Sequence, residues 1–359
     1  MMQGKETHKH KLGIIIPVYK LRESYLKQCV YSVLDQDDLD LEIVLVDDCS
    51  PDNCGGICEE LASNDCRIKV VHHEKNKGLP AARNTGLAAV DSEWVSFVDG
   101  DDWVDSRTFS ALMERIEQLD RRPDFVMFPG CLSYKDNEIV DTSYEEKRWY
   151  NKEEIDELQV LALSMPLKIY PNRAVAFDTA WAKVISYDFL IENDILFRDL
   201  PYREDGMYFQ EITESASYIE FLPVGMYHYR MTEGSMVHSF RQNAPQEQKK
   251  YLDMLWEFGK SHDKGQEYTK ALFASALVSM QVCITCFFYH KKNKATNRRQ
   301  QCIKYFSMQP YCDVFEHVKF RELKRNFLIK AVLIYIKNYY LLNAMRERYL
   351  KNNKCICFE

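Results

Sequence analysis

Several features are missing from the sequence, and each absence excludes a class of protein. There is no internal repeat and no low-complexity linker, so neither a repeat array nor a flexible tether accounts for the 359 residues. The stretch from Met1 to Lys11 is polar and has no apolar core, which argues against a secretory signal peptide. A formal net charge of -7 argues against a nucleic-acid-binding protein. We therefore expect one large globular domain with an appendage.

Cysteine is plentiful but scattered. The chain has 12 cysteines, and without a signal peptide we interpret them as reduced cytosolic thiols that mostly serve in packing. Cys283 and Cys286 form one Cys-x-x-Cys pair inside an apolar run, and without a second pair we favour packing over a zinc site. Cys355 and Cys357 could carry a lipid, but the ending does not match a prenylation box.

Charge is distributed unevenly along the chain. From His290 onward there are 16 Lys and Arg against 5 Asp and Glu, a net charge of +11, whereas the preceding part carries -18. A basic tail on an acidic body suggests an anionic surface or partner for the tail. The alternative is a solvated helical face.

One apolar run ends in a dense group of acids. Residues 94–98 have the Val, Phe and Trp content of a buried strand, and Asp99, Asp101 and Asp102 follow at once. Carboxylates this close repel one another, and a divalent cation such as Mg²⁺ or Mn²⁺ is the simplest partner. The alternative is a solvated Asp-Gly turn followed by a helix cap.

The first hundred residues alternate between predicted strands and helices, which indicates a parallel, doubly wound sheet. The first strand ends at Pro17-Val18-Tyr19, the second at Asp47-Asp48, and the fourth at the acid group. The carboxyl ends of such strands meet at one sheet edge, where α/β proteins bind ligands. Gly78-Leu79-Pro80 opens a helix of small residues that can approach the sheet closely, and its N-terminus with Arg83 can meet an anion. The predicted strands are 12–16, 42–46, 67–72 and 94–98, with helices at 23–34 and 53–64 between them.

Five segments in this order resemble the motifs of family 2 glycosyltransferases with the GT-A fold. The resemblance covers about residues 10 to 110, and its specificity comes from five motifs at fitting distances, because a lone Asp-x-Asp would be weak. Lys20 departs from the family, which usually has Asn there. The segments are Ile16-Pro17-Val18-Tyr19, Val46-Asp47-Asp48-Cys49-Ser50, Asn76-Lys77-Gly78, Ala82-Arg83-Asn84 and Asp99-Gly100-Asp101-Asp102.

The resemblance implies a role for each motif. Tyr19, in the loop with Pro17 and Val18, would stack on the nucleotide base, usually uracil, and Asp48 would hydrogen-bond to that base. Arg83 would lie near base or phosphate. Asp99, with Gly100, would face the donor's ribose or sugar. Asp101 would coordinate the Mn²⁺ or Mg²⁺ that bridges the diphosphate, whose charge must be neutralised as the glycosidic bond breaks.

Later segments also resemble the family. Trp181-Ala182-Lys183 is followed by Glu204-Asp205, which opens a helix. On local evidence these acids favour helix capping. The resemblance instead implies that Asp205 is the catalytic base, with Glu204 as the fallback. Tyr227-His228-Tyr229-Arg230 resembles the segment that folds over the donor. His228 is our candidate for a further metal ligand and His238 the second choice, although a lone His is often structural. Arg230 would reach the diphosphate or pair with a surface acid.

After about residue 244 the pattern is helical. Residues 271–289 are long enough to cross a bilayer, but polar residues recur at helical spacing and favour a buried helix. Residues 327–345 and their basic neighbours would suit an anionic membrane surface. Packing on the catalytic domain or on a second subunit is the alternative.

These observations predict a GT-A glycosyltransferase domain of the α/β class over residues 1–243, with a nucleotide-sugar half at about 10–110 and an acceptor half at about 111–243. Residues 244–359 would form a helical region that contacts a membrane or a second copy. We expect an inverting, metal-dependent enzyme that uses a UDP-sugar and a glycan or lipid-linked acceptor of surface polysaccharide synthesis, in the cytoplasm or at the inner face of the membrane. A sugar nucleotidyltransferase is an alternative, although no Gly-rich, Arg-containing loop follows the first strand. A non-catalytic glycan-binding protein is another, which the intact acids argue against.

Overall fold

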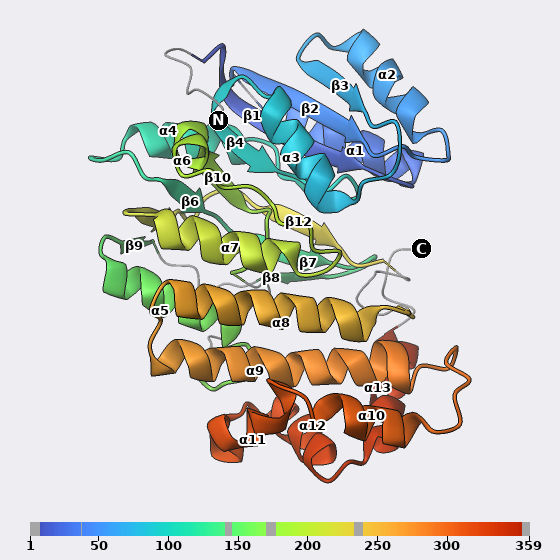
Figure 1. Cartoon of the computed structure of the whole chain (residues 1–359). Helices are drawn as coiled ribbons and strands as arrows, with labels where there is room; N and C mark the ends of the chain where they lie inside the picture. The colour runs from blue at the N-terminus through green and yellow to red at the C-terminus, as the bar shows by residue number, and fades with distance from the viewer. Residues whose placement is uncertain (1–7, 37, 141–145, 170–176, 233–239, 354–359) are drawn as a thin grey trace. The chain divides into compact units, whose positions relative to one another are not determined.

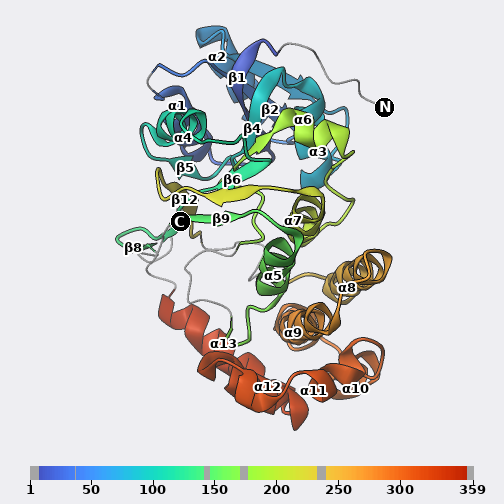
Figure 2. The ribbon, with the colours of Figure 1, turned by 90° about the vertical axis from the view of Figure 1, so that its left-hand side faces the viewer.

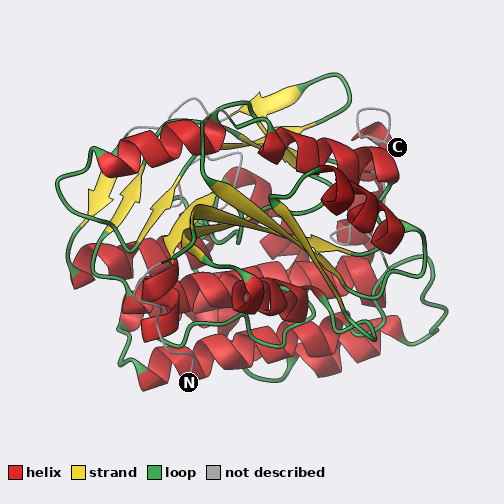
Figure 3. Cartoon of the chain, turned by 90° about the horizontal axis from the view of Figure 1, so that it is seen from above, coloured by secondary structure: helices red, strands yellow, loops and turns green. Residues whose placement is uncertain are grey.

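The computed structural model describes residues 8–36, 38–140, 146–169, 177–232 and 240–353. The chain divides into two compact units. The first contains residues 1–133, 137–156 and 173–230, and the second contains 134–136, 157–172 and 231–359. The predicted division after residue 243 stays a prediction. Figure 1 labels the elements, and Figure 3 shows by colour that the chain mixes helices and strands.

The first unit is built on a large sheet of eight strands. The four strands predicted from the sequence form its parallel half, in the order β3-β2-β1-β4, so the α/β fold class is confirmed. The other half is mixed, because β10 runs antiparallel to both of its neighbours. In spatial order the strands are β3 (Ile68–His72), β2 (Leu41–Asp47), β1 (His10–Val18), β4 (Ser92–Phe97), β10 (Lys183–Ser186), β6 (Phe125–Met127), β11 (Ile219–Phe221) and β9 (Lys147–Trp149).

Helices cover both faces of the parallel half because its strands are apolar on both sides. Ile14 and Ile16 of β1 share the main core with the buried side of α1 (Glu23–Leu34) and with α2 (Cys54–Asn64). Ile15 points to the other face, against Gly86 of α3 (Leu79–Ala89), where an added Cβ would lie 2.2 Å from the Ile15 Cγ2 atom. The predicted close approach of a small-residue helix to the sheet is therefore confirmed, and Figure 1 shows α3 crossing these strands.

A second sheet of four strands lies in the same unit. Its order is β5-β12-β7-β8, with β12 antiparallel to β5 and parallel to β7. The strand β5 begins at the residue after Asp102, so this sheet is joined directly to the acid group. The strands are β5 (Trp103–Val104), β12 (Tyr227–Arg230), β7 (Gly130–Ser133) and β8 (Glu138–Val140). The remaining helices before residue 231 are α4 (Thr108–Glu117), α5 (Lys152–Leu163), α6 (Tyr187–Glu192) and α7 (Glu204–Ser215).

The second unit is helical, as predicted. Helices α8 and α9 run side by side in Figures 1 and 2. The continuous segment Gln266–Phe288 has the length and composition to cross a membrane, but 78% of its apolar window is buried inside the structure. Ser279 in this segment contacts the Tyr311 hydroxyl at 3.0 Å, as the prediction of a buried helix requires. The helices of the second unit are α8 (Ala244–Ser261), α9 (Gln266–Cys283) with its π-helical extension Ile284–Phe288, α10 (Arg298–Phe306), α11 (Val314–His317), α12 (Arg325–Tyr335) and α13 (Tyr339–Asn353).

The cysteines are free thiols within the described part of the chain, as predicted. Cys283 and Cys286 are both buried on the apolar segment, and neither belongs to a metal-ligating group among the described residues. Packing is therefore the reading that the structure supports for this pair. Cys355 and Cys357 lie outside the described residues.

Candidate active site

The carboxyl ends of the parallel strands meet at one edge of the sheet, as the sequence predicts. The last residue of β1, Val18, is in register with Asp47 of β2. After β4 the chain turns back over β1, and Gly100 comes so close that an added Cβ would lie 3.0 Å from the Pro17 carbonyl oxygen and 2.5 Å from Leu21. Only glycine fits this approach without a shift, so Pro17, Val18 and Gly100 share one site.

Tyr19 lies just beyond β1 with 40% of its surface exposed, so its ring is accessible to a ligand. The next residue, Lys20, has a left-handed backbone with φ of 54°. Asn tolerates this conformation better than Lys, which gives a physical reason for the Asn that the family usually has here. The Lys20 ammonium lies 5.0 Å from the centre of the Tyr19 ring.

Asp48 is buried and holds the turn before α3. Its carboxylate accepts hydrogen bonds from the backbone N–H groups of Lys77 and Gly78, each at 2.8 Å. His73 lies 2.6 Å from the same carboxylate, and its other nitrogen is 2.8 Å from the Thr85 hydroxyl. The structure thus links two of the predicted motifs through Asp48, and the contact of Asp48 with a base stays a prediction.

Arg83 joins the donor side of the site to α7. One guanidinium nitrogen lies 2.9 Å from Asp99 and another 3.0 Å from Glu204, which is 121 residues away in sequence. The side chain is only 3% exposed and rests over the Phe197 ring at 5.1 Å. Burial alone would lower the pKa of Arg83, but Asp99 and Glu204 together raise it, so the cation is firmly held. The three predicted residues are therefore brought together.

Asp102 has a structural position that the sequence reasoning missed. It is 1% exposed, and its carboxylate accepts hydrogen bonds from the Tyr227 hydroxyl at 2.7 Å and from the Arg230 backbone N–H at 2.8 Å. The Tyr227 hydroxyl in turn accepts the Asp99 N–H at 3.0 Å. Burial and then Asp101 raise the pKa of Asp102 well above its usual range. The acid group is thereby fastened to β12.

Among the described residues, no other residue donates a hydrogen bond to the Asp101 carboxylate. Burial, followed by the charge of Asp99, raises the pKa of the Asp101 carboxyl to about 6. The Arg230 guanidinium donates to the Asp101 carbonyl oxygen at 2.5 Å and lies 4.2 and 4.3 Å from the centres of the Tyr25 and Trp103 rings. A partly buried carboxylate with uncompensated charge and hard oxygen donors fits the binding of Mn²⁺ or Mg²⁺.

Asp205 lies in the first turn of α7, where one carboxylate oxygen accepts the N–H of Gly206 at 2.8 Å. Burial first, and then the nearby Glu204 and Asp178, raise the pKa of Asp205 to about 7. A carboxyl group with this pKa exchanges its proton near neutrality, which suits a general base. Both acids lie in the first turn of α7, so compensation of the helix N-terminus stays the alternative explanation for them.

Burial also lowers the pKa of Lys183 to about 7. Its ammonium donates to the Phe177 and Thr179 carbonyl oxygens at 3.0 and 2.6 Å. Trp181, two residues earlier, stacks on Tyr227 with ring centres 4.3 Å apart. The Trp-x-Lys segment thus packs against the strand that holds Asp102.

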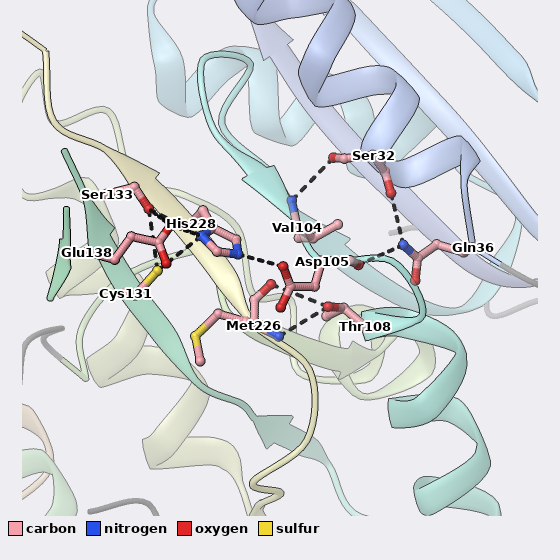
Figure 4. Close-up of polar contacts among 10 residues, drawn as sticks. All are labelled: Ser32, Gln36, Val104, Asp105, Thr108, Cys131, Ser133, Glu138, Met226 and His228. Atoms are coloured by element: carbon pink, nitrogen blue, oxygen red, sulfur yellow. Dashed lines mark hydrogen bonds and ion pairs between the residues drawn. The ribbon is translucent and has the colours of Figure 1, made fainter. Parts of the chain in front are cut away.

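His228 lies in the small sheet, where its two ring nitrogens contact carboxylates of Asp105 and Glu138 at 2.8 and 2.9 Å (Figure 4). Asp101 is not among the contacts of His228 in the described part of the chain, so the structure does not bring these two predicted metal ligands together. The role of His228 at the donor metal stays a prediction. His238 lies outside the described residues.

A family model described as glycosyl transferase family 2 matches residues 13–181, which include every donor-side motif above. Residues 13–181 therefore form a glycosyltransferase family 2 domain. It is 32% identical to the uncharacterized glycosyltransferase EpsJ of Bacillus subtilis over 230 residues, which is 63% of this chain and 62% of EpsJ. It is 34% identical over 121 residues to the teichuronic acid biosynthesis glycosyltransferase TuaG of the same organism, covering 33% of this chain and 43% of TuaG. The chain thus spans less than two thirds of the length of these relatives.

Solved structures show the same fold for this chain. Residues 1–349 of TarS from S. aureus, in complex with UDP-GlcNAc, align with a TM-score of 0.63 at 19% identity, over 95% of this chain and 92% of that one. At this identity the likeness establishes the GT-A fold and no more. The expected family and fold are therefore both confirmed.

The family motifs identified most of this site, but not Asp102, His73 or Tyr227 as structural partners. Asp102 was recognised only as one of three acids. Asp102 directly precedes the apolar pair Trp103-Val104, and this position indicated that its carboxylate is buried. A buried carboxylate needs a hydrogen-bond partner inside the protein.

Proposed function

We propose that this chain transfers a sugar from a UDP-sugar to a hydroxyl group of a glycan or lipid-linked acceptor, in the synthesis of a surface polysaccharide or teichoic acid. The observation that carries the proposal is the Arg83 bridge, because it links Asp99, the residue expected to face the donor, to Glu204, the neighbour of the expected base Asp205. The names of EpsJ and TuaG, and the UDP-GlcNAc held by TarS, support this substrate class. Transfer of a hexosyl group and transfer of an N-acetylhexosaminyl group are both consistent with this proposal.

In the proposed reaction Asp205 accepts the proton of the acceptor hydroxyl while that oxygen attacks the anomeric carbon. The bond from this carbon to the diphosphate breaks in the same displacement, UDP leaves with the electron pair, and the configuration inverts. The pKa of about 7 supports this role, because it allows Asp205 to be ionised before the reaction and protonated after it. Glu204 is already paired with Arg83, so it is the weaker candidate.

The proposal includes Mn²⁺ or Mg²⁺. The ion would neutralise the diphosphate as it leaves, and Asp101 would hold it. The raised pKa of Asp101 supports this assignment, because an uncompensated carboxylate gains most from a cation. The Arg230 guanidinium donates to the backbone carbonyl oxygen of Asp101 rather than to its carboxylate, so the carboxylate stays available for the cation.

Calorimetric titration tests the donor site. We expect UDP and one or more UDP-sugars to bind the wild-type chain in the presence of Mn²⁺, and Asp101→Asn to lose the Mn²⁺-dependent part. Turnover with an acceptor panel should release UDP. Release of pyrophosphate would instead identify a nucleotidyltransferase, and binding without turnover would favour a glycan-binding protein.

Asp205→Asn tests the base. We expect a loss of about 10²- to 10⁴-fold in kcat with donor binding retained. The wild-type rate should fall as pH drops below about 7, because the base must be unprotonated. Glu211→Gln is a matched control on the same helix, since Glu211 only pairs with Arg198 at 2.7 Å, and it should keep near-normal turnover. Near-normal turnover by Asp205→Asn would place the base elsewhere.

We also propose that α12 and α13 lie on the inner, anionic face of a membrane. Large apolar side chains are exposed along these two helices and their connection, which soluble surfaces seldom show at this density. Exposed basic side chains lie among them, including Arg325, Lys337, Arg348 and Lys351. Apolar groups for the acyl boundary and cations for anionic headgroups are the two needs of an interfacial helix. The exposed apolar residues are Ile329, Val332, Tyr335, Ile336, Tyr340, Leu341, Met345 and Tyr349.

Vesicle sedimentation of the full chain tests this surface. We expect binding to vesicles that contain phosphatidylglycerol, weaker binding to pure phosphatidylcholine, and at least a tenfold loss for the combined variant Ile329→Ser, Ile336→Ser and Tyr340→Ser. Tyr31→Ser is the control, because Tyr31 is 54% exposed on α1. Equal binding by both variants would refute the assignment. A dimer in light scattering that the combined variant abolishes would point to a second copy instead.

A further inference from the structure

Side chains of four residues converge on one face of the small sheet. Cys131 and Ser133 lie two residues apart on β7, so they share a face. Strand register places His228 of β12 opposite Cys131, and Glu138 of β8 opposite Ser133. The sulfur of Cys131, a carboxylate oxygen of Glu138 and a ring nitrogen of His228 all lie within 4.8 Å of one another. Figure 4 shows the group together with Asp105 on the opposite side of the ring.

The spacing of these atoms is close to that of a tetrahedral ligand set. The Nδ1 atom of His228 is 2.9 Å from Glu138 Oε1, 3.2 Å from Cys131 Sγ and 3.2 Å from Ser133 Oγ. Ser133 Oγ is 2.9 Å from the Glu138 oxygen and 3.4 Å from the sulfur. Zinc bonds of about 2.0 to 2.3 Å would separate tetrahedral ligands by roughly 3.3 to 3.7 Å. Small outward shifts of a few tenths of an ångström would therefore admit the ion.

Three side chains approach Nδ1 of His228, although that atom has one proton or one lone pair to share. The Nε2 atom is 2.8 Å from Asp105, and the ring stacks on Trp103 with centres 4.8 Å apart and planes at 7°. If Nε2–H donates to Asp105, the Nδ1 lone pair faces the Glu138 carboxylate. A metal-binding histidine typically donates its second N–H to a carboxylate in this way.

We propose that Cys131, Glu138 and His228 bind Zn²⁺, with Ser133 or a water molecule in the fourth position and Asp105 positioning the imidazole. A thiolate, an imidazole and a carboxylate are the ligand types that zinc prefers, whereas Mn²⁺ and Mg²⁺ prefer oxygen. The thiolate and carboxylate balance the charge of the ion. The site is separate from the cation site at Asp101 and does not depend on the transferase activity.

The position of the site gives it a structural role. The ion would tie β8 and β7 to β12, the strand whose Tyr227 and Arg230 hold Asp102. It would therefore brace the strand behind the acid group. His228 would then stabilise the donor site from outside it, rather than through a contact with the donor's metal.

Metal titration of the full chain tests the proposal. After removal of metals with a chelator, we expect one equivalent of Zn²⁺ to bind in competition with a chromophoric chelator. Co²⁺ in its place should give the visible bands of a tetrahedral site and a near-ultraviolet thiolate-to-cobalt charge-transfer band. Cys131→Ser should remove that band, and Cys131→Ser and His228→Gln should each weaken zinc binding more than about 100-fold, since even an outer partner costs 10- to 100-fold. Asp105→Asn should fall in that smaller range.

Two control variants separate this site from others. Cys49→Ser removes an exposed cysteine outside the group, and Asp101→Asn alters the other cation site, so both should keep the zinc equivalent and the cobalt spectrum. Circular dichroism in chelator checks that the variants fold like the metal-free wild type. A wild type that binds no zinc, or zinc binding that survives both Cys131→Ser and His228→Gln, would show that the group is an imidazolium held by two carboxylates and would overturn the proposal.

Discussion

Asp101→Asn should stabilise the metal-free protein while it removes metal-dependent donor binding. In the structure the Asp101 carboxylate is largely buried beside Asp99, and its charge has no ion-pair partner among the described residues. Replacing it with the neutral amide of nearly equal shape removes that unfavourable charge. A residue that binds a cation is thus expected to cost stability whenever the cation is absent.

The magnitude follows from the shift in the pKa of Asp101, from 3.8 to about 6. Because the folded chain holds the proton more tightly than the unfolded chain, this group destabilises the fold as pH rises from about 4 to about 6. Each pKa unit corresponds to about 1.4 kcal/mol, so the full effect at pH 7 is about 3 kcal/mol, and about 2 kcal/mol after allowance for partial exposure of the carboxylate. Below about pH 4 the contribution vanishes, since Asp101 is protonated in both states.

Urea unfolding in the presence of a chelator, at pH 4.5 and pH 7, measures this effect. We expect the stability of Asp101→Asn relative to wild type to rise by about 1.3 kcal/mol between the two pH values, because about a third of the full effect is already present at pH 4.5. Asp120→Asn, at an exposed position, should change by less than about 0.5 kcal/mol over the same range. Added Mn²⁺ should then stabilise the wild type and leave the variant unaffected. A difference between wild type and variant that does not depend on pH would refute the reasoning.

Two further substitutions test the packing around the site, each by urea unfolding. Arg83→Met leaves two carboxylates without their buried cation and should lower the free energy of unfolding by about 3 to 5 kcal/mol. The control Arg67→Ala breaks a partly exposed pair and should lower it by less than about 1 kcal/mol. Equal losses would mean that burial of the Arg83 bridge is energetically unimportant. Gly86→Ala forces a methyl group against β1 and should cost about 1 to 3 kcal/mol, whereas Gly265→Ala, with no neighbouring atom within 4 Å of the new carbon, should stay within about 1 kcal/mol; a neutral Gly86→Ala would show that α3 can move away from the sheet.

The parallel half of the sheet could be predicted because its strands are apolar on both faces and alternate with helices at regular distances. The first helix spans Glu23–Leu34 as predicted, since Leu26, Val30 and Val33 mark its buried side. The position of β10 between β4 and β6 could not be predicted, because pairing between strands about 90 residues apart leaves no periodic signal in either strand. Strands β8 and β9 are short and mostly exposed, so they lack the alternation that identifies a strand.

The acid motif itself was predictable, but the division of labour within it was not. Three carboxylates in four residues look equivalent in sequence. The fold pairs Asp99 with Arg83, fastens Asp102 to Tyr227 and to the backbone of β12, and leaves Asp101 with a raised pKa. The two partners of Asp102 lie 125 residues or more away in sequence, a separation that no local pattern encodes.

Each of the three acids therefore has a separate role, and only Asp101 keeps an uncompensated charge that a cation could neutralise. Asp102 costs free energy to bury, and the two hydrogen bonds that compensate it hold β12 against the end of β4. Asp99, held by Arg83, fixes the distance to α7 and its Asp205. Asp101 is then presented on a rigid frame whose residual negative charge only a cation relieves. A cation at Asp101, as proposed above, would relieve that charge, and the diphosphate of a bound donor would supply oxygen ligands that the frame does not.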